Sequence, residues 1–131
     1  MNQPLRGTSV LIVEDEVIIG LMLFNEIAGA GGKPMGPVTS VADAVKEIES
    51  QGVDVVILDA KLVDGWGADL AVFLEQRRIP FVVVSGYDKA NLPDGLKAAP
   101  FVAKPISLPI LLDAIRSLMP GEAPGTPLEA R

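Results

Sequence analysis

The chain has 131 residues and a net charge of −6, and its length suits one domain built around a single hydrophobic core. It has neither cysteine nor histidine, which excludes disulfides, thiol nucleophiles, imidazole bases and most transition-metal sites. The acidic charge argues against direct contact with nucleic acid. No apolar run approaches the ~18 residues of a membrane span and the N-terminus lacks a signal-peptide pattern, so we expect a cytoplasmic protein without membrane contact.

Short apolar runs alternate with helical patterns along the chain. In chain order we expect a strand at Val10–Val13, a helix at Val17–Ala28, an edge strand at Lys33–Val38, a helix at Val41–Ser50, a strand at Val53–Leu58, a helix at Ala68–Arg77, strands at Pro80–Val84 and Phe101–Ala103, and a helix at Leu108–Leu118. This alternation predicts an α/β fold with helices on both faces of a five-stranded parallel sheet. The doubly wound, flavodoxin-like order 2-1-3-4-5 fits best.

Several boundary signals refine this assignment. Ser40, with Asp43 three residues later, is a capping-box signature for the second helix, and Ser107 is the expected cap of the last one. Residues 86–100 contain two prolines and two glycines, so a fourth helix there must be short or irregular. We expect the domain to span residues 8–119, with residues 120–131 forming a disordered tail or a linker.

Polar side chains stand where the central strands end. Glu14, Asp15 and Glu16 follow the first strand, Asp59 the third, Ser85 the fourth and Lys104 the fifth. An aspartate before a Gly-rich stretch is often only a turn former. Because ligands of such sheets bind beyond the carboxyl ends of the strands, the four strand ends together favour a functional site.

Converging carboxylates without histidine or cysteine make an oxygen-only site suited to Mg²⁺. We expect Asp15 and Asp59 to bind the ion directly, Glu14 through water and Lys61 through its backbone carbonyl. A carboxylate beside a cation and the ammonium of Lys104 is a phosphoryl acceptor. Glu16 is expected only to favour the N-terminus of the first helix.

These motifs resemble the receiver domain of response regulators, over about residues 8–119. The resemblance lies in EDE after strand one, D at the end of strand three, S after strand four and KP after strand five. It implies that Asp59 is the phosphoacceptor, supplied by a phosphohistidine of a sensor histidine kinase or a histidine phosphotransfer protein. It also implies that Ser85 is the switch hydroxyl, Phe101 the switch aromatic and Lys104 the phosphate-binding lysine. In this family the Lys104–Pro105 peptide is often cis.

The chain departs from the family's pattern in the loop after Asp59. That loop usually resembles LPDGDG and here reads LVDGWG, with Val63 and Trp66 as the changed residues. We expect Trp66 either to cover the third helix or to contact a partner. Lys61 and Tyr87 are placed to control the access of water to an acyl phosphate.

The first helix is too apolar to be buried on every side. If Val17, Leu21, Phe24 and Ala28 face the sheet, then Ile19 and Met22 lie on an outer face near the acidic cluster. The alternatives are packing against the fifth helix and a docking surface for the phosphodonor, with Ile19, Met22 and Pro105 as its residues.

The favoured interpretation is a stand-alone receiver domain that is not an enzyme with a separate substrate, although a receiver from a hybrid kinase remains open. The weak fourth helix argues against a conventional two-fold dimer, so we expect a monomer or a weak dimer. The alternatives are a Mg²⁺-dependent phosphohydrolase with Asp59 as nucleophile, an interaction module that accepts no phosphate, and a flavin-binding domain. Lys61 stands where aspartyl phosphatases usually carry a second acid, and the first loop is acidic where a flavin phosphate needs amides.

Overall fold

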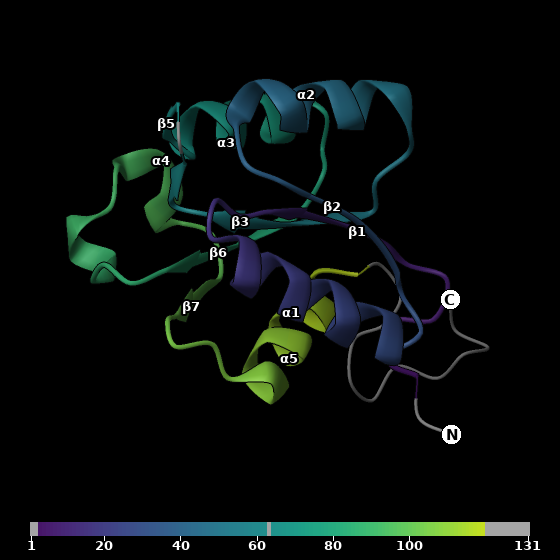
Figure 1. Ribbon diagram of the computed structural model, residues 1–131. Helices are drawn as coiled ribbons and strands as arrows, with labels where there is room; N and C mark the ends of the chain where they lie inside the picture. Colours follow the sequence, from purple (N-terminus) through teal and green to yellow (C-terminus); the bar gives the residue numbers. More distant parts are fainter. Residues whose placement is uncertain (1–2, 63, 120–131) are drawn as a thin grey trace, which may run out of the picture.

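The computed structural model describes residues 3–62 and 64–119, and within these a five-stranded parallel sheet lies between two layers of helices (Figure 1). The strands are β1 (Ser9–Val13), β2 (Lys33–Val38), β3 (Val55–Asp59), β6 (Phe81–Ser85) and β7 (Phe101–Ala103). Their order is β2-β1-β3-β6-β7. This order confirms the predicted doubly wound topology.

The helices divide between the two faces of the sheet (Figure 1). One face is covered by α2 (Val41–Ser50), α3 (Ala68–Gln76) and the short α4 (Asp94–Lys97), and the other by α1 (Val17–Gly29) and α5 (Leu108–Leu118). Each face has its own core cluster, because alternate side chains of a strand point to opposite sides. Strands β3 and β6 are buried along their whole length, as their continuous apolar sequence predicts.

The buried face of α1 differs from the expected one. Gly20, Leu23 and Ile27 are the buried residues of this helix, whereas Val17 and Leu21 are more than half exposed. Both sets follow the i, i+3/i+4, i+7 spacing of a helical stripe, so periodicity alone cannot separate them in so apolar a segment. The choice of Val17 and Leu21 as core residues was therefore wrong.

Only one of the two predicted helix caps is present. The Ser40 hydroxyl accepts a hydrogen bond from the backbone N–H of Asp43 at 3.1 Å, which confirms the cap of α2. Ser107 occupies the N-cap position of α5 but forms no side-chain capping hydrogen bond. The expectation for Ser107 was wrong in this respect, because residue type alone does not fix the rotamer that capping requires.

Residues 86–100 carry one turn of 3-10 helix (Lys89–Asn91) and the four-residue α4, so the prediction of a short, irregular fourth helix is confirmed. Beyond β3 the chain forms a small antiparallel hairpin, β4 (Lys61–Leu62) and β5 (Gly65–Trp66), that the sequence did not indicate. Before β1, Leu5 is fully buried against the α1–α5 core cluster, upstream of the boundary expected at residue 8. Val63 and the expected tail at 120–131 lie outside the described residues.

Candidate functional site

The parallel register of the sheet brings three polar strand ends together. Asp59 is the last residue of β3 and pairs with Val84, the neighbour of Ser85 in β6. Ser85 pairs with Ala103 of β7, and the Lys104 N–H donates to the Ser85 carbonyl at 2.8 Å. The three side chains therefore reach one edge of the sheet, as their positions in the sequence predicted.

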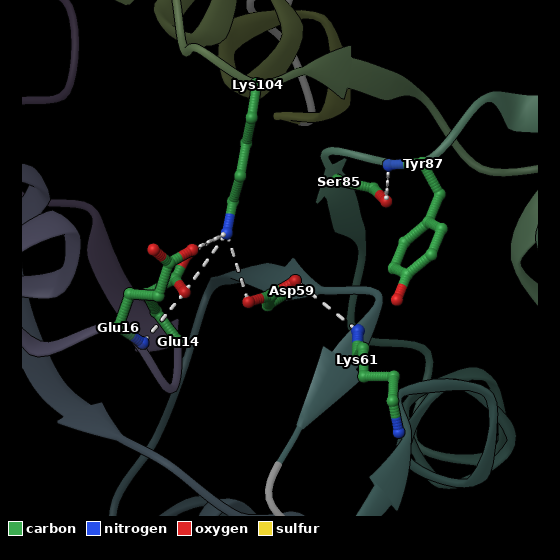
Figure 2. Close-up of polar contacts among 7 residues, drawn as sticks. All are labelled: Glu14, Glu16, Asp59, Lys61, Ser85, Tyr87 and Lys104. Carbon is green, nitrogen blue, oxygen red and sulfur yellow. Dashed lines mark hydrogen bonds and ion pairs between the residues drawn. The ribbon is translucent and has the colours of Figure 1, made fainter.

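Lys104 is the centre of an ion-pair network (Figure 2). Its Nζ lies 3.2 Å from Oδ2 of Asp59, 3.1 Å from Oε1 of Glu14 and 3.0 Å from Oε1 of Glu16. Glu14 is fully buried and Asp59 is 5% exposed, whereas Glu16 is exposed. Three carboxylates thus share one ammonium group at the edge of the core.

The charges of the cluster shift one another's proton affinity. Burial, reinforced by the neighbouring Glu14 carboxylate, raises the pKa of Asp59 to about 6 even though Lys104 opposes the shift. Burial and the nearby Asp59 also raise the pKa of Asp15. Burial alone would lower the pKa of Lys104, but Glu16, Asp59 and Glu14 outweigh it and raise that pKa. The carboxylates are therefore under-compensated by one lysine.

The acidic residues fit a divalent cation. One carboxylate oxygen from each of Glu14, Asp15, Glu16 and Asp59 lies within 4.8 Å of the others. Among the described residues, Oε1 of Glu14 is buried without a hydrogen-bond partner, although Lys104 Nζ lies within ion-pair distance. A hard cation with oxygen ligands would relieve both the mutual repulsion and this unsatisfied oxygen.

A pocket of about 290 Å³ opens onto this cluster. Its lining residues are Asp15, Glu16, Asp59, Lys61, Gly86, Tyr87 and Lys104. Ser85 lies beside it, 1% exposed, and its Oγ accepts a hydrogen bond from the Tyr87 N–H at 2.9 Å (Figure 2). The hydroxyl is therefore buried next to the pocket and already has a donor partner.

The loop after Asp59 is fixed at two points. Gly67 donates to the Ala60 carbonyl at 2.7 Å, and a Cβ there would lie 2.8 Å from the Asp59 carbonyl oxygen, so the close approach requires glycine. The Asp64 carboxylate accepts from the backbone N–H groups of Val41 (3.0 Å) and Ala42 (3.4 Å), which hold the pKa of Asp64 below its usual range. The loop that follows Asp59 is thereby joined to the start of α2.

Three side chains lie together beside the pocket: Lys61 and Trp66 of the β4–β5 hairpin, and Tyr87, which follows β6. The Lys61 N–H lies 3.4 Å from Oδ1 of Asp59, while its Nζ lies 5.3 Å from the centroid of the Trp66 ring. The Tyr87 ring lies 5.6 Å from the Trp66 ring. Trp66 therefore lies against two residues that line the pocket, Lys61 and Tyr87, without lining it itself.

The remaining predicted residues differ in how exposed they are to solvent. Phe101 is half-buried on β7 and packs against the α2–α3 core cluster. Pro105 is exposed after a cis Lys104–Pro105 peptide, as expected. Met22 is exposed, but Ile19 is half-buried and packs against the α1–α5 core cluster, so it is not the outward-facing residue that helical spacing suggested.

Two features of this region were missed from the sequence. Glu16 was assigned only to the helix terminus, yet its carboxylate lies 3.0 Å from Lys104 Nζ. Ile18, the most exposed large apolar residue described at 83%, was not chosen as a surface residue. The run of three acids was the available signal for Glu16; no sequence signal fixed the rotation of α1 that exposes Ile18.

The chain belongs to the response regulator receiver domain family, whose model matches residues 10–116. The swarming motility regulation protein RssB of Serratia marcescens is 30% identical over 115 residues, covering 84% of this chain and 52% of RssB. The transcriptional regulatory protein PdtaR of Mycobacterium tuberculosis is 31% identical over 110 residues, covering 81% of this chain and 54% of PdtaR. The chain thus spans about half the length of these relatives.

A solved structure agrees with this assignment. SdrG from Sphingomonas melonis Fr1 is 33% identical and superimposes with a TM-score of 0.74, over 86% of this chain and 96% of SdrG. The resemblance inferred from the sequence is confirmed: the chain is a receiver domain, a phosphoacceptor module of two-component signalling. Receiver domains work with histidine kinases or phosphotransfer proteins and bind Mg²⁺ at an acidic pocket. No helix among the described residues is long and apolar enough to cross a bilayer.

Proposed function

We propose that this chain accepts a phosphoryl group on the carboxylate of Asp59 from a phosphohistidine of a sensor kinase or phosphotransfer protein. The observation that carries the proposal is the position of Asp59, which is 5% exposed, faces a pocket and lies 3.2 Å from the ammonium of Lys104. An acceptor needs an ionised oxygen with access to the donor and positive charge nearby for the transferred group.

In the proposed reaction a carboxylate oxygen of Asp59 forms a bond to phosphorus as the bond from phosphorus to the donor imidazole nitrogen breaks. The electron pair of that bond returns to the imidazole. Lys104 already lies beside Asp59 and supplies positive charge to the phosphoryl oxygens. These oxygens compete for its ammonium with its present carboxylate partners. Ser85 donates its hydroxyl hydrogen to a phosphoryl oxygen and so reports the modified state to β6 and, through the adjacent strand, to Phe101.

Mg²⁺, when bound, neutralises charge on the phosphoryl oxygens and aligns the donor with the acceptor. The residues that would hold it are Asp15 and Asp59 directly and Glu14 through water, with the backbone carbonyl of Lys61 as a further ligand. The support is the grouping of carboxylate oxygens within 4.8 Å and the unsatisfied Oε1 of Glu14.

The surface that receives the phosphodonor is proposed to lie on α1 beside the pocket. The exposed apolar side chains there are Val17, Ile18, Leu21 and Met22. Ile110 of α5 lies on the same side of the sheet as α1, and the exposed Pro105 precedes α5 in the chain. Exposed apolar patches of this kind are typical of partner surfaces, and a helix of the donor can pack against them. Ile19 contributes through packing rather than by direct exposure.

The phosphorylation proposal is tested by intact mass after incubation with acetyl phosphate, with and without Mg²⁺. We expect wild type to gain one phosphoryl group only with Mg²⁺, and Asp59→Asn to gain none, because the amide keeps the shape but loses the nucleophilic oxygen. Asp69→Asn, at an exposed aspartate in the first turn of α3, is the matched control and should label normally. Persistent labelling of Asp59→Asn would place the acceptor elsewhere.

A further inference from the structure

Lys61 carries a positive charge beside an acidic pocket without neutralising any of its carboxylates. It lines the pocket with Asp15, Glu16 and Asp59. Within the described part of the chain, however, the ion pairs of the acidic cluster all go to Lys104. Figure 2 shows the side chain of Lys61 turned away from Asp59. Because Lys61 is exposed and an exposed ion pair stabilises little, one competing contact is enough to turn its ammonium away from these carboxylates.

The competing contact is with the ring of Trp66. Lys61 and Trp66 are directly paired across the β4–β5 hairpin, which brings their side chains to the same face. The Lys61 Nζ lies 5.3 Å from the ring centroid, within the range of a cation–π contact. The Trp66 ring also packs near the Tyr87 ring, at 5.6 Å between ring centroids. The ring is thus held in place to receive the ammonium.

The alternative position of Lys61 would affect the acidic pocket. The carboxylates already share one ammonium, and a second ammonium among them would satisfy the same oxygens that a divalent cation uses. In addition to Lys104, a second ammonium at these oxygens would compete with a divalent cation for them and repel it. Whatever keeps Lys61 at the rim therefore favours binding of the divalent cation.

We propose that Trp66 is a positioning residue, which holds the Lys61 ammonium at the rim of the pocket and so leaves the acidic cluster free for a divalent cation. The inference rests on the proposed role of the cluster in Mg²⁺ binding. It goes further by assigning a function to a residue that lies outside the charged site and differs from the family's usual loop sequence.

The test compares Mg²⁺ affinity, by isothermal titration calorimetry, in wild type, Trp66→Leu, Lys61→Met and the double variant. Loss of a surface cation–π contact should weaken Mg²⁺ binding by Trp66→Leu about two- to fivefold. Lys61→Met, which keeps the backbone carbonyl proposed as a ligand and removes only the competing ammonium, should bind at least as tightly as wild type. In the Lys61→Met background, Trp66→Leu should have no further effect, because no ammonium remains to be released.

Phe73→Leu is the matched control, since Phe73 also lies under a cation, the Arg77 guanidinium at 4.4 Å, but Arg77 does not line the pocket as Lys61 does. It should leave Mg²⁺ affinity unchanged. Circular dichroism verifies folding, and Trp66→Met replaces Trp66→Leu if the latter does not fold. Weakening that persists in the Lys61→Met background would overturn the inference, because it would show that Trp66 acts only by shaping the loop.

A second readout does not depend on the metal. In wild type, the ε-methylene protons of Lys61 should show an upfield ring-current shift by NMR, and Trp66→Leu should abolish it. An unshifted Lys61 in wild type would contradict the inference. If wild type failed to bind Mg²⁺ at all, the proposed metal site would fall and the inference with it, whereas equal affinities of wild type and Trp66→Leu would remove the inference alone.

Discussion

At the scale of single residues, the site is a set of buried charges that only partly compensate one another. Asp59 and Glu14 are nearly inaccessible to solvent, and a buried carboxylate without a partner destabilises the fold. Lys104 offsets this cost at distances of 3.1 to 3.2 Å but must also serve the exposed Glu16. One ammonium therefore leaves the carboxylates with excess negative charge, which favours binding of a further cation.

We expect the affinity for Mg²⁺ to rise between pH 5 and pH 7. The raised pKa of Asp59, about 6 in the folded protein against an ordinary value of 3.8, means that the proton leaves only as the pH passes 6. Since the ion binds the carboxylate, its affinity should be roughly tenfold lower at pH 5 than at pH 7. Calorimetric titrations at the two pH values measure this difference directly.

The same raised pKa has the opposite effect on the metal-free protein. The unfolded chain loses the Asp59 proton near pH 4 and the folded chain near pH 6, so the contribution of this residue to stability decreases as the pH rises through that window. In Asp59→Asn, the part of the change in the free energy of unfolding with pH that is due to this residue should be absent.

Equal Mg²⁺ affinities of wild type at pH 5 and 7 would contradict the assignment of Asp59 as a ligand.

At the scale of the elements, α2 is fixed at its N-terminus by both local and distant groups. Ser40, next to the helix in sequence, caps it by accepting from the Asp43 N–H. Asp64, in the loop that follows Asp59, accepts from the N–H groups of Val41 and Ala42. A carboxylate at this end also interacts favourably with the helix dipole. The start of α2 is thus physically connected to the region that the proposed reaction modifies.

We expect Ser40→Ala to lower the free energy of unfolding by about 1 kcal/mol, the usual consequence of losing an N-cap hydrogen bond. Ser107→Ala is the matched control, because Ser107 also precedes a helix but makes no capping hydrogen bond, so its effect should be clearly smaller. Urea denaturation of both variants gives the comparison. A cost for Ser107→Ala equal to that of Ser40→Ala would mean that its hydroxyl caps α5 in solution.

At the scale of the whole molecule, the sheet separates two faces with different surfaces. The helices α2 and α3 bury their apolar stripes against one core cluster, and the exposed large apolar residues of α1 gather on the other face, near the end of β1 that carries the acids. A receiver that works through protein contact needs such a surface beside its phosphorylation site. The patch on α1 is the surface that we propose for this contact.

We expect Ile18→Glu combined with Met22→Glu to slow phosphotransfer from a partner at least tenfold, because two charges would be buried in an apolar interface. Labelling by acetyl phosphate, which needs no docking, should be unchanged. The phosphodonor is the autophosphorylated histidine kinase that labels wild type fastest in a panel, followed by radiolabel transfer. Val72→Glu, at an exposed apolar position on α3, is the control. Equal slowing with both donors would show that the α1 substitutions damage the site itself.

The sequence by itself determined the topology of the sheet and the residues that meet at its edge. Continuous apolar strands and alternating helices leave few arrangements, and a parallel sheet necessarily brings Asp59, Ser85 and Lys104 to one side. Residues 86–100 were also predictable, because proline and glycine exclude a long helix.

Only the tertiary structure decided which face of α1 is buried, where Glu16 and Lys61 place their charged ends, and whether Ser107 acts as a cap. In an almost uniformly apolar helix, two stripes fit the same periodicity, and packing of Leu23 and Ile27 against the sheet selects one of them. The long side chains of Glu16 and Lys61 can contact several groups, and in the folded protein Glu16 lies close to Lys104 and Lys61 close to Trp66. Those distances depend on loops and hairpin register, which local sequence patterns do not fix.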